Sequence, residues 1–256
     1  MILADVAAIE GIVRAKEYPL SSKYDPTWVL QLDMGLHPLW QLEDLLPALN
    51  LRPEMRVLDL GSGRGATSVF LARECEVRVT ACDLWVSADD IQQVLEASGV
   101  ADVVSAVNAD ARDLPFGDEE FDAVVSIDAF EYFGTDVHFL PKLLRVLKSG
   151  GSIGVSTPGL RTDPYAGGVP SSVSEVVGFE AAAWHSAEWW HRHWELTAMV
   201  DEINASWQPR GYENWLLWAE AVREYANDDS EDHVLNMLRQ DDGREIGFVL
   251  LTARRR

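Results

Sequence analysis

The stretch VLDLGSGRGATS, residues 57–68, constrains the fold of this chain more than any other feature. It begins as a short run of buried-strand residues and continues into a helix-forming segment, and Gly61, Gly63 and Gly65 stand at the junction. Glycine permits positive φ angles and lets the backbone approach a ligand closely. A glycine turn between a strand and a helix therefore predicts a binding loop for a nucleotide-type cofactor.

Two other interpretations of this turn stay open at this point. Gly61, Gly63 and Ala66 also satisfy the dinucleotide pattern G-x-G-x-x-[GA], which is typical of nicotinamide and flavin proteins. A tight turn that binds no ligand has the same local sequence.

Strands and helices alternate after the turn, which favours a parallel sheet covered by helices on both faces. We expect a Rossmann-like, doubly wound α/β fold with a mostly parallel seven-stranded sheet. The expected strands are 57–60, 77–82, 103–107, 121–127, 152–156, 199–206 and 245–253, and the expected core helices are 66–74, 88–97 and 136–147.

Helical segments flank this core on both sides of the sequence. We expect one domain over 1–256, divided into an N-terminal helical cap (1–50), a cofactor-binding core (51–160), a lid with insertion helices (161–245) and a last strand (246–256). The cap would hold helices at 3–16 and 38–49. The lid would begin with a mobile segment at 160–180, which is rich in Gly, Ser and Pro, and continue with a helix at 186–198 and two helices between 212 and 239.

Charge and cysteine content exclude several classes of function. Asp and Glu number 42 against 21 Lys and Arg, a formal net charge of −21 that would repel nucleic acid and anionic membranes. The two cysteines, Cys75 and Cys82, cannot form a disulfide framework or a zinc site. We find no signal-peptide pattern and no apolar run of membrane-spanning length, so the sequence predicts a cytoplasmic protein.

Two further features separate the possible cofactors. Asp83 ends the strand VRVTACD, 18 residues after Gly65, where a carboxylate can accept both hydroxyls of a ribose. Adenosyl and nicotinamide cofactors would both use this acid. However, the sequence after residue 210 holds two helices and the apolar strand GFVLLTA rather than a second mononucleotide-binding half, which disfavours a dinucleotide.

The combined motifs resemble the class I S-adenosylmethionine-dependent methyltransferases, in particular the small-molecule branch that acts in ubiquinone and sterol pathways. VLDLGSGRG is similar to the first motif of that family, ACD to the second, and NADARDLPFGDEEFDAVVS to its D-x-x-x-LPF-x-x-x-x-FD segment; LKSGGSIGVSTPG resembles its fifth strand. The resemblance implies S-adenosyl-L-methionine as cofactor, S-adenosyl-L-homocysteine as product and a small-molecule methyl acceptor.

The resemblance also implies roles for individual residues. The loop Gly61–Gly65 would lie beneath the methionine half of the cofactor, and Asp59 would order this loop. Asp83 would hold the ribose. Adenine would pack on Leu84 or Trp85, with Asp110 and the Ala111 amide at its edge, and the end of the fourth strand, from Ser126 to Asp128, would face the methyl group.

Methyl transfer from a sulfonium is an in-line displacement, so orientation and exclusion of water do most of the work. A hydroxyl or ammonium acceptor would also need a base, and the candidate catalytic residues are Asp128, Glu131, Tyr132 and His185. Asp128 and Glu131 would place two carboxylates over the methyl group, where they attract a cationic acceptor or raise one pKa. The alternative is that Glu131 is a solvated loop acid.

Seven of the ten tryptophans fall between residues 184 and 218. Core packing against the sheet explains each of them separately. The alternative is an aromatic acceptor pocket, for which we name Tyr18, Trp28, Met34, His37, Trp40 and Trp189. Such an acidic, aromatic pocket suits an amine or a flat ring.

No metal site is expected, because His191 and His193 are two residues apart and would point to different faces of a helix. The leading hypothesis is therefore methyl transfer to O or N of a small aromatic or amine-bearing metabolite. The alternatives are a nicotinamide-dependent oxidoreductase and a non-catalytic protein that binds the adenosyl cofactor. The sequence does not predict the oligomeric state.

Overall fold

A seven-stranded sheet with the order β3-β2-β1-β4-β5-β7-β6 forms the centre of the computed structural model, which describes residues 12–14, 16–226 and 232–256. Neighbouring strands are parallel except that β7 is antiparallel to both β5 and β6. This confirms the mostly parallel α/β fold, and it differs from the 3-2-1-4-5-6 order of dinucleotide-binding folds. The strands are β1 (Arg56–Leu60), β2 (Arg78–Asp83), β3 (Val104–Asn108), β4 (Phe121–Ile127), β5 (Leu147–Leu160), β6 (Val200–Trp207) and β7 (Ile246–Arg255).

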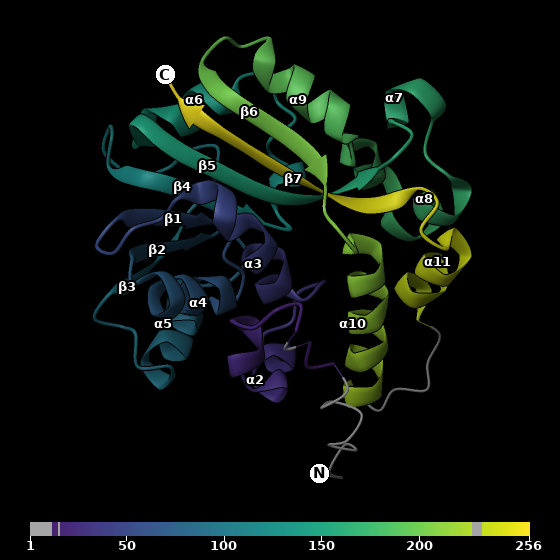
Figure 1. The fold of residues 1–256 in the computed structure, drawn as a ribbon, viewed down its shortest axis with the longest axis horizontal. Coiled ribbons are helices and arrows are strands. Elements are labelled where there is room, and N and C mark those ends of the chain that lie inside the picture. The colour runs from purple at the N-terminus through teal and green to yellow at the C-terminus, as the bar shows by residue number, and fades with distance from the viewer. Residues whose placement is uncertain (1–11, 15, 227–231) are drawn as a thin grey trace.

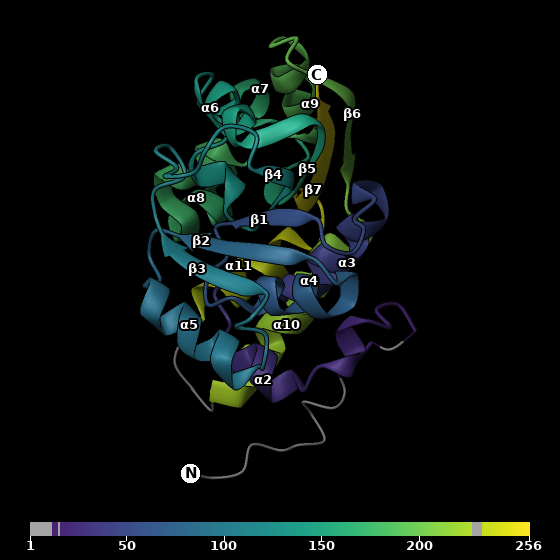
Figure 2. The ribbon, with the colours of Figure 1, turned by 90° about the vertical axis from the view of Figure 1, so that its left-hand side faces the viewer.

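Helices cover both faces of the sheet (Figures 1 and 2). One face packs against α3 (Pro38–Leu49), α4 (Ala66–Cys75), α5 (Ala88–Ala97) and part of α10 (Gly211–Ala226). The opposite face packs against α6 (Phe139–Val146) and α9 (Ala187–Glu195). The other helical elements are η1 (Ser21–Lys23), α2 (Pro26–Gln31), η2 (Phe130–Tyr132), α7 (Pro164–Gly167), α8 (Ser171–Val177), η3 (Gly178–Ala183) and α11 (His233–Asp241).

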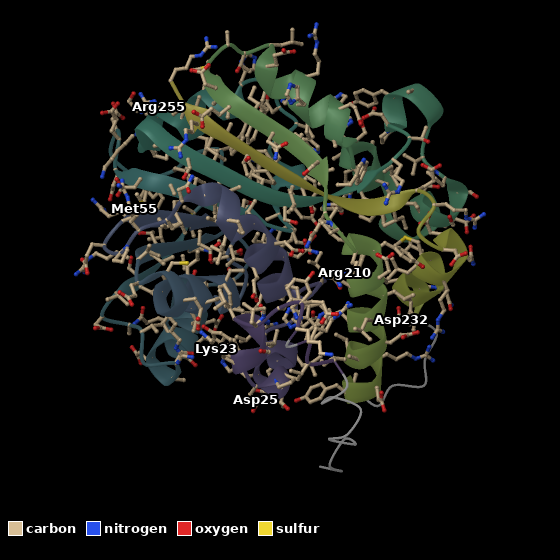
Figure 3. All side chains as sticks on the ribbon, in the orientation of Figure 1. Lys23, Asp25, Met55, Arg210, Asp232 and Arg255 are labelled. Carbon is tan, nitrogen blue, oxygen red and sulfur yellow. The ribbon has the colours of Figure 1, made fainter. Side chains whose placement is uncertain are left out.

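The residues of β1 show why the central strands are apolar on both faces. Val57 packs in the core cluster on the α3 and α4 side, whereas Leu58 packs in the cluster on the α6 and α9 side. Successive side chains of a strand point to opposite faces, so a strand buried on both faces needs a continuous apolar run. Figure 3 shows side chains filling the layers between the sheet and its helices.

The structure corrects the expectation for residues 160–180. A mobile segment was expected from its Gly, Ser and Pro content, but the structure forms α7, α8 and η3 between residues 164 and 183. Val173 and Ala181 are buried in a third core cluster with α10 and α11, and this tertiary packing outweighs the weak local helix propensity. The strand expected at 152–156 is also longer, because β5 pairs with β7 over Ser152–Leu160. The helix expected at 3–16 falls largely outside the described residues.

Five of the seven tryptophans between residues 184 and 218 are buried core residues. Trp190, Trp194 and Trp218 are fully buried, and Trp184 and Trp215 are nearly so. They join the sheet to α9, α10 and η3 instead of forming an open aromatic pocket. Within the described part of the chain, no helix combines the length and apolarity needed to cross a membrane.

Candidate active site

The glycine loop between β1 and α4 has the backbone conformation that its sequence predicts. Gly61, Gly63 and Gly65 have φ angles of 75°, 53° and 91°. A Cβ on Gly61 would lie 2.3 Å from the Ala129 Cβ, and one on Gly63 would lie 3.0 Å from the Met34 Sδ. The loop therefore passes so close to its neighbours that side chains have no room.

Asp59 fixes the helix that follows this loop. Its Oδ2 accepts hydrogen bonds of 2.6 Å from the hydroxyls of Thr67 and Ser68 in the first turn of α4. Burial raises the pKa of Asp59 to about 6. Asp59 thus anchors the first turn of α4, and it does not line the cavity described next.

Asp83, at the end of β2, binds two loops through backbone amides. Its Oδ2 accepts from the Gly63 amide at 2.8 Å, and its Oδ1 accepts from the amides of Trp85 and Val86 at 2.8 and 2.9 Å. Asn108, at the end of β3, donates from Nδ2 to the carbonyl oxygens of Asp83, Leu84 and Val86 and so fixes the same turn. Asn108 is not among the predicted site residues, although it is the first residue of the segment NADARDLPF.

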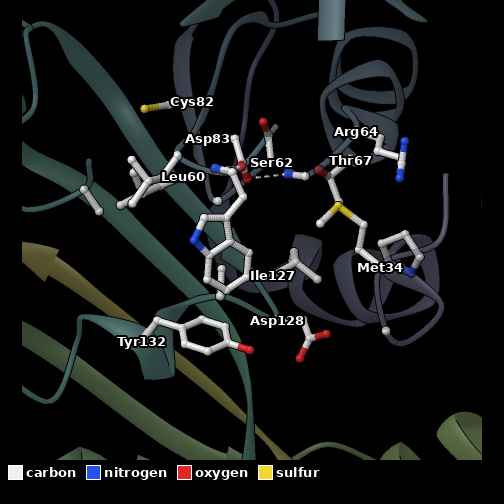
Figure 4. A pocket seen from close by; sticks show the side chains of 18 of the residues that line it. Met34, Leu60, Ser62, Arg64, Thr67, Cys82, Asp83, Ile127, Asp128 and Tyr132 are labelled. Atoms are coloured by element: carbon white, nitrogen blue, oxygen red, sulfur yellow. Dashed lines mark hydrogen bonds between the residues drawn. The ribbon is translucent and has the colours of Figure 1, made fainter. Parts of the chain in front are cut away.

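A cavity of about 310 Å³ lies at the carboxyl ends of β1, β2 and β4. Figure 4 shows Asp83 and the glycine loop on one side of it and Asp128 and Tyr132 on another. Ligands of open α/β sheets bind at this position, where the strand order reverses. Predicted residues in the lining are Met34, Gly61, Gly63, Asp83, Leu84, Trp85, Asp110, Ala111, Asp128 and Tyr132.

Asp110 is held by a salt bridge at the outer end of the cavity. Its carboxylate accepts from Nε and Nη2 of Arg112 at 2.9 and 2.7 Å, and this pairing lowers the pKa of Asp110. Leu84 and Trp85 are 49% and 66% exposed, so both present apolar surface to the cavity mouth. Trp85 also packs edge-on against Tyr132, with 5.0 Å between ring centroids.

Acidic side chains gather where β4 ends. Burial raises the pKa of Asp128 well above its usual range, and the nearby charges of Glu131 and Asp33 raise it further. Glu131 is buried behind the cavity wall; its Oε2 accepts from the Thr157 hydroxyl at 2.8 Å, and burial raises its pKa to about 7. Of Asp128 and Glu131, Asp128 is therefore the one that lines the cavity, and Glu131 is not the solvated acid of the alternative interpretation.

Asp128 adopts a backbone conformation that few residues tolerate. Its φ angle is 52°, and its amide donates to the Ser156 carbonyl at 2.8 Å. Aspartate visits this left-handed region more readily than most side chains do. Tyr132 follows in η2 and is half-exposed, and burial together with the charges of Glu131 and Asp128 raises its pKa.

His185 does not belong to this cavity, which corrects its prediction as a base. It is fully buried; its Nδ1 lies 3.0 Å from the Asp163 Oδ2, and its ring stacks on Trp189 at 3.5 Å. Burial lowers its pKa. Ser126 is also outside the lining, because it is fully buried within β4. Its hydroxyl has no hydrogen-bond partner among the described residues.

Five residues predicted for an acceptor pocket do not line the cavity either. His37 caps α3, with Nδ1 accepting from the Trp40 amide at 3.2 Å, and burial lowers its pKa to about 3. Trp40 stacks on His37 at 3.9 Å, and Tyr18 bonds to Asp44 and Asn214. Trp28 packs on Tyr24 and Trp189 on His185, so these aromatic residues stabilise the fold.

The structure adds lining residues that the sequence did not indicate. Ser62 is buried, and its hydroxyl has no partner among the described residues, so it can donate to a ligand. Gly35, Leu36, Arg64, Thr67 and Arg112 also line the cavity. Gly35 and Leu36 come from the N-terminal cap, where no motif marks them.

The glycine turn, the carboxylate on the adjacent strand and the cavity between them define a Rossmann-like protein that binds a nucleoside-type cofactor. Residues 58–155 match the family described as a methyltransferase domain. The chain is 34% identical over 192 residues to the demethylmenaquinone methyltransferase of Clavibacter sepedonicus, covering 72% of this chain and 76% of that protein. It is also 34% identical over 119 residues to the glycine/sarcosine/dimethylglycine N-methyltransferase of Actinopolyspora halophila, covering 46% of this chain and only 20% of that protein.

Solved structures share the fold at low sequence identity. Geranyl diphosphate C-methyltransferase from Streptomyces coelicolor A3(2) matches with a TM-score of 0.70 and 19% identity over 99% of both chains. Phosphoethanolamine N-methyltransferase 2 of Haemonchus contortus matches with a TM-score of 0.72 and 16% identity over 96% of this chain and 60% of that one.

The chain belongs to the class I S-adenosylmethionine-dependent methyltransferases. It is an enzyme of the type that methylates small molecules, and it uses S-adenosylmethionine as its cofactor. These findings confirm the family resemblance and rule out the alternative of a nicotinamide-dependent oxidoreductase.

Proposed function

We propose that the cavity binds S-adenosylmethionine between Asp83 and Asp128, and that the enzyme methylates O or N of a small aromatic or amine-bearing molecule. The observation that carries this proposal is the hydrogen bond between the Asp83 carboxylate and the Gly63 amide. It joins a ribose-type acid to the glycine loop at one end of a cavity whose other end holds Asp128.

The residues present fit this cofactor. The hydroxyl of Ser62 is buried, unpartnered among the described residues and part of the lining, so it is available to a polar end of a ligand. The closely packed glycine loop leaves backbone amides as the surface offered to the methionine half. Asp83 would accept from the ribose, Asp110 and the Ala111 amide would bind the adenine edge, and Leu84 and Trp85 would cover its face.

Once bound, the cofactor supplies an activated methyl group on a sulfonium. The protein then has to orient the acceptor, exclude water and, for a protonated or hydroxyl acceptor, remove a proton. Asp128 is the carboxylate placed for that proton, because it alone of the predicted acids Asp128 and Glu131 lines the cavity. Glu131 acts through Asp128: burial raises the pKa of Asp128, and the charge of Glu131 raises it further.

The cavity wall supports an amine-bearing or aromatic acceptor. Asp128 supplies negative charge, whereas the ring of Tyr132 supplies an aromatic surface in the same cavity. A cation gains from both the charge and the aromatic faces, and a flat ring gains from the faces alone. The name of one relative, an N-methyltransferase of glycine, sarcosine and dimethylglycine, agrees with the amine alternative.

Calorimetric titration with S-adenosylhomocysteine tests the site. We expect one-to-one micromolar binding to the wild type, and Asp83→Ala should weaken it by about 1–3 kcal/mol through loss of charge-assisted hydrogen bonds. Asp102→Ala is the matched control, since Asp102 lies in an exposed turn before β3 and outside the cavity lining. Equal affinities for Asp83→Ala and Asp102→Ala would overturn the placement of the cofactor.

A panel of amines and phenols with labelled S-adenosylmethionine tests the acceptor class. Methyl transfer to members of either group supports the proposal. Cofactor binding with transfer only to carbon acceptors would contradict the O or N assignment. Cofactor binding with no transfer to any amine or phenol would likewise contradict it.

A further inference from the structure

One wall of the cavity comes from the segment between α2 and α3, residues 33–37, which we call the strap. Met34, Gly35 and Leu36 of the strap line the cavity. The Met34 Sδ lies 3.0 Å from where a Cβ of Gly63 would be, and a Cβ on Gly35 would lie 2.7 Å from the Asp128 Oδ2. The strap therefore touches both the glycine loop and Asp128.

The strap is short and has no regular secondary structure over residues 33–36, so its position depends on tertiary contacts. One of these comes from α10: the Trp218 Nε1 donates to the Asp33 Oδ1 at 2.7 Å. Trp218 is fully buried, and its ring also meets the edge of His37 at 4.5 Å. One residue of α10 thus holds both ends of the strap.

The Asp33 carboxylate is also part of the electrostatics of the site. Burial raises its pKa, whereas the hydrogen bonds from Trp218 and the Gly35 amide and the charge of Arg64 lower it. In turn, the charge of Asp33 raises the pKa of Asp128, together with Glu131. The charged groups that face Asp33 are therefore Arg64 from the glycine loop and Asp128 from the end of β4.

We propose that Trp218 is a positioning residue of the active site, which acts through Asp33 to hold the strap against the glycine loop and Asp128. The inference rests on the proposed placement of the cofactor in this cavity. Trp218 lies outside the cavity lining and contacts Asp33 and His37, so the strap links it to the cavity.

The test compares Trp218→Phe, Asp33→Ala and the double variant by calorimetric titration with S-adenosylhomocysteine. Phenylalanine keeps an aromatic ring but cannot donate, and alanine has no acceptor, so either single variant breaks the hydrogen bond between Trp218 and Asp33. We expect each single variant to bind about three- to tenfold more weakly than the wild type, and the double variant to bind no more weakly than the weaker single one.

Trp194→Phe is the matched control. Trp194 is also fully buried, but it packs on the opposite face of the sheet, and its Nε1 has no partner among the described residues. Its substitution should lower the unfolding temperature, as Trp218→Phe does, while leaving the affinity within about twofold of the wild type.

The pH dependence of the affinity provides a readout that packing alone would not move. Removing the Trp218 donor raises the pKa of Asp33, so in Trp218→Phe the affinity should begin to fall at a higher pH as the solution is acidified. Asp33→Ala should lack this step, whereas Asp128 and Glu131 titrate in all variants.

Additive losses in the double variant, or an unchanged pH profile in Trp218→Phe, would overturn the inference and make Trp218 a core residue only. Failure of the wild type to bind S-adenosylhomocysteine would instead refute the proposed cofactor site. The two results are distinguishable because the second appears before any variant is made.

Discussion

Gly61 and Ala129 approach so closely that a Cβ on Gly61 would lie 2.3 Å from the Ala129 Cβ. The contact brings the loop after β1 against the residue that follows Asp128 beyond β4. The glycine loop and the segment after β4 are therefore in direct contact along one wall of the cavity.

Gly61→Ala should destabilise the fold by more than the backbone strain of its positive φ angle alone. Gly150 is the matched control, because its φ of 72° is close to the 75° of Gly61 but a Cβ there would meet nothing within 4 Å. We expect Gly150→Ala to lower the free energy of unfolding by about 1 kcal/mol and Gly61→Ala by about 3 kcal/mol. Urea denaturation measures both values, and equal losses would contradict the close contact.

Glu131→Gln should stabilise the protein at alkaline pH and have little effect near pH 5. The folded state raises the pKa of Glu131 from 4.5 to about 7, so it binds a proton that the unfolded chain releases. Stability is therefore lost as the pH rises from about 4.5 to 7, by up to about 3 kcal/mol. Glutamine removes this loss and can still accept from Thr157. Unfolding free energies at pH 5 and pH 8.5 test the prediction, which a pH-independent difference would refute.

Asp128→Asn should reduce methyl transfer without weakening cofactor binding. An amide cannot take up the proton, and removing a general base typically costs about 10²-fold or more in rate. The affinity for S-adenosylhomocysteine should stay within about threefold of the wild type, because the loss is expected in the transfer step. Initial rates with an acceptor from the panel measure the effect. Asp136→Asn, at an exposed acid eight positions further on, should match the wild type in both measurements.

Trp85→Ala should weaken cofactor binding without changing stability. The indole is 66% exposed and contributes little to the core, yet it lines the cavity and packs against Tyr132. We expect about tenfold weaker binding of S-adenosylhomocysteine from the loss of apolar contact. Phe179→Ala removes an even more exposed ring, at 89%, outside the cavity lining and should leave the affinity unchanged. Equal losses in both variants would show that Trp85 has no specific role.

The cofactor loop and its acid could be predicted because their signals are local. Gly61, Gly63 and Asp83 lie at strand ends, and parallel strands bring such ends to one edge of a sheet. The core strands could be predicted from local sequence too, because burial on both faces requires a continuous apolar run along each strand. The structure brings these three residues together as expected.

The remaining part of the site depends on contacts between distant positions. Asp33 bonds to Trp218 across 185 residues, and no local pattern in either segment indicates this pair. The aromatic residues failed as pocket predictions for a related reason: Trp40 and Trp189 have the same composition signal whether they face a cavity or stack on a buried histidine. Only tertiary packing separates the two cases.

The antiparallel strand β7 has a consequence for the order in which the protein folds during synthesis. In the described sheet, β6 bonds only to β7, and β7 also completes the pairing of β5. As long as β7 has not been synthesised, the apolar edge strand β5 is therefore unpaired on one side, and β6 has no strand with which to pair. The pairings of β7 with β5 and β6 are non-local and form late, so the nascent chain exposes the unpaired edge of β5 until they form. Chaperone binding would matter most at that stage.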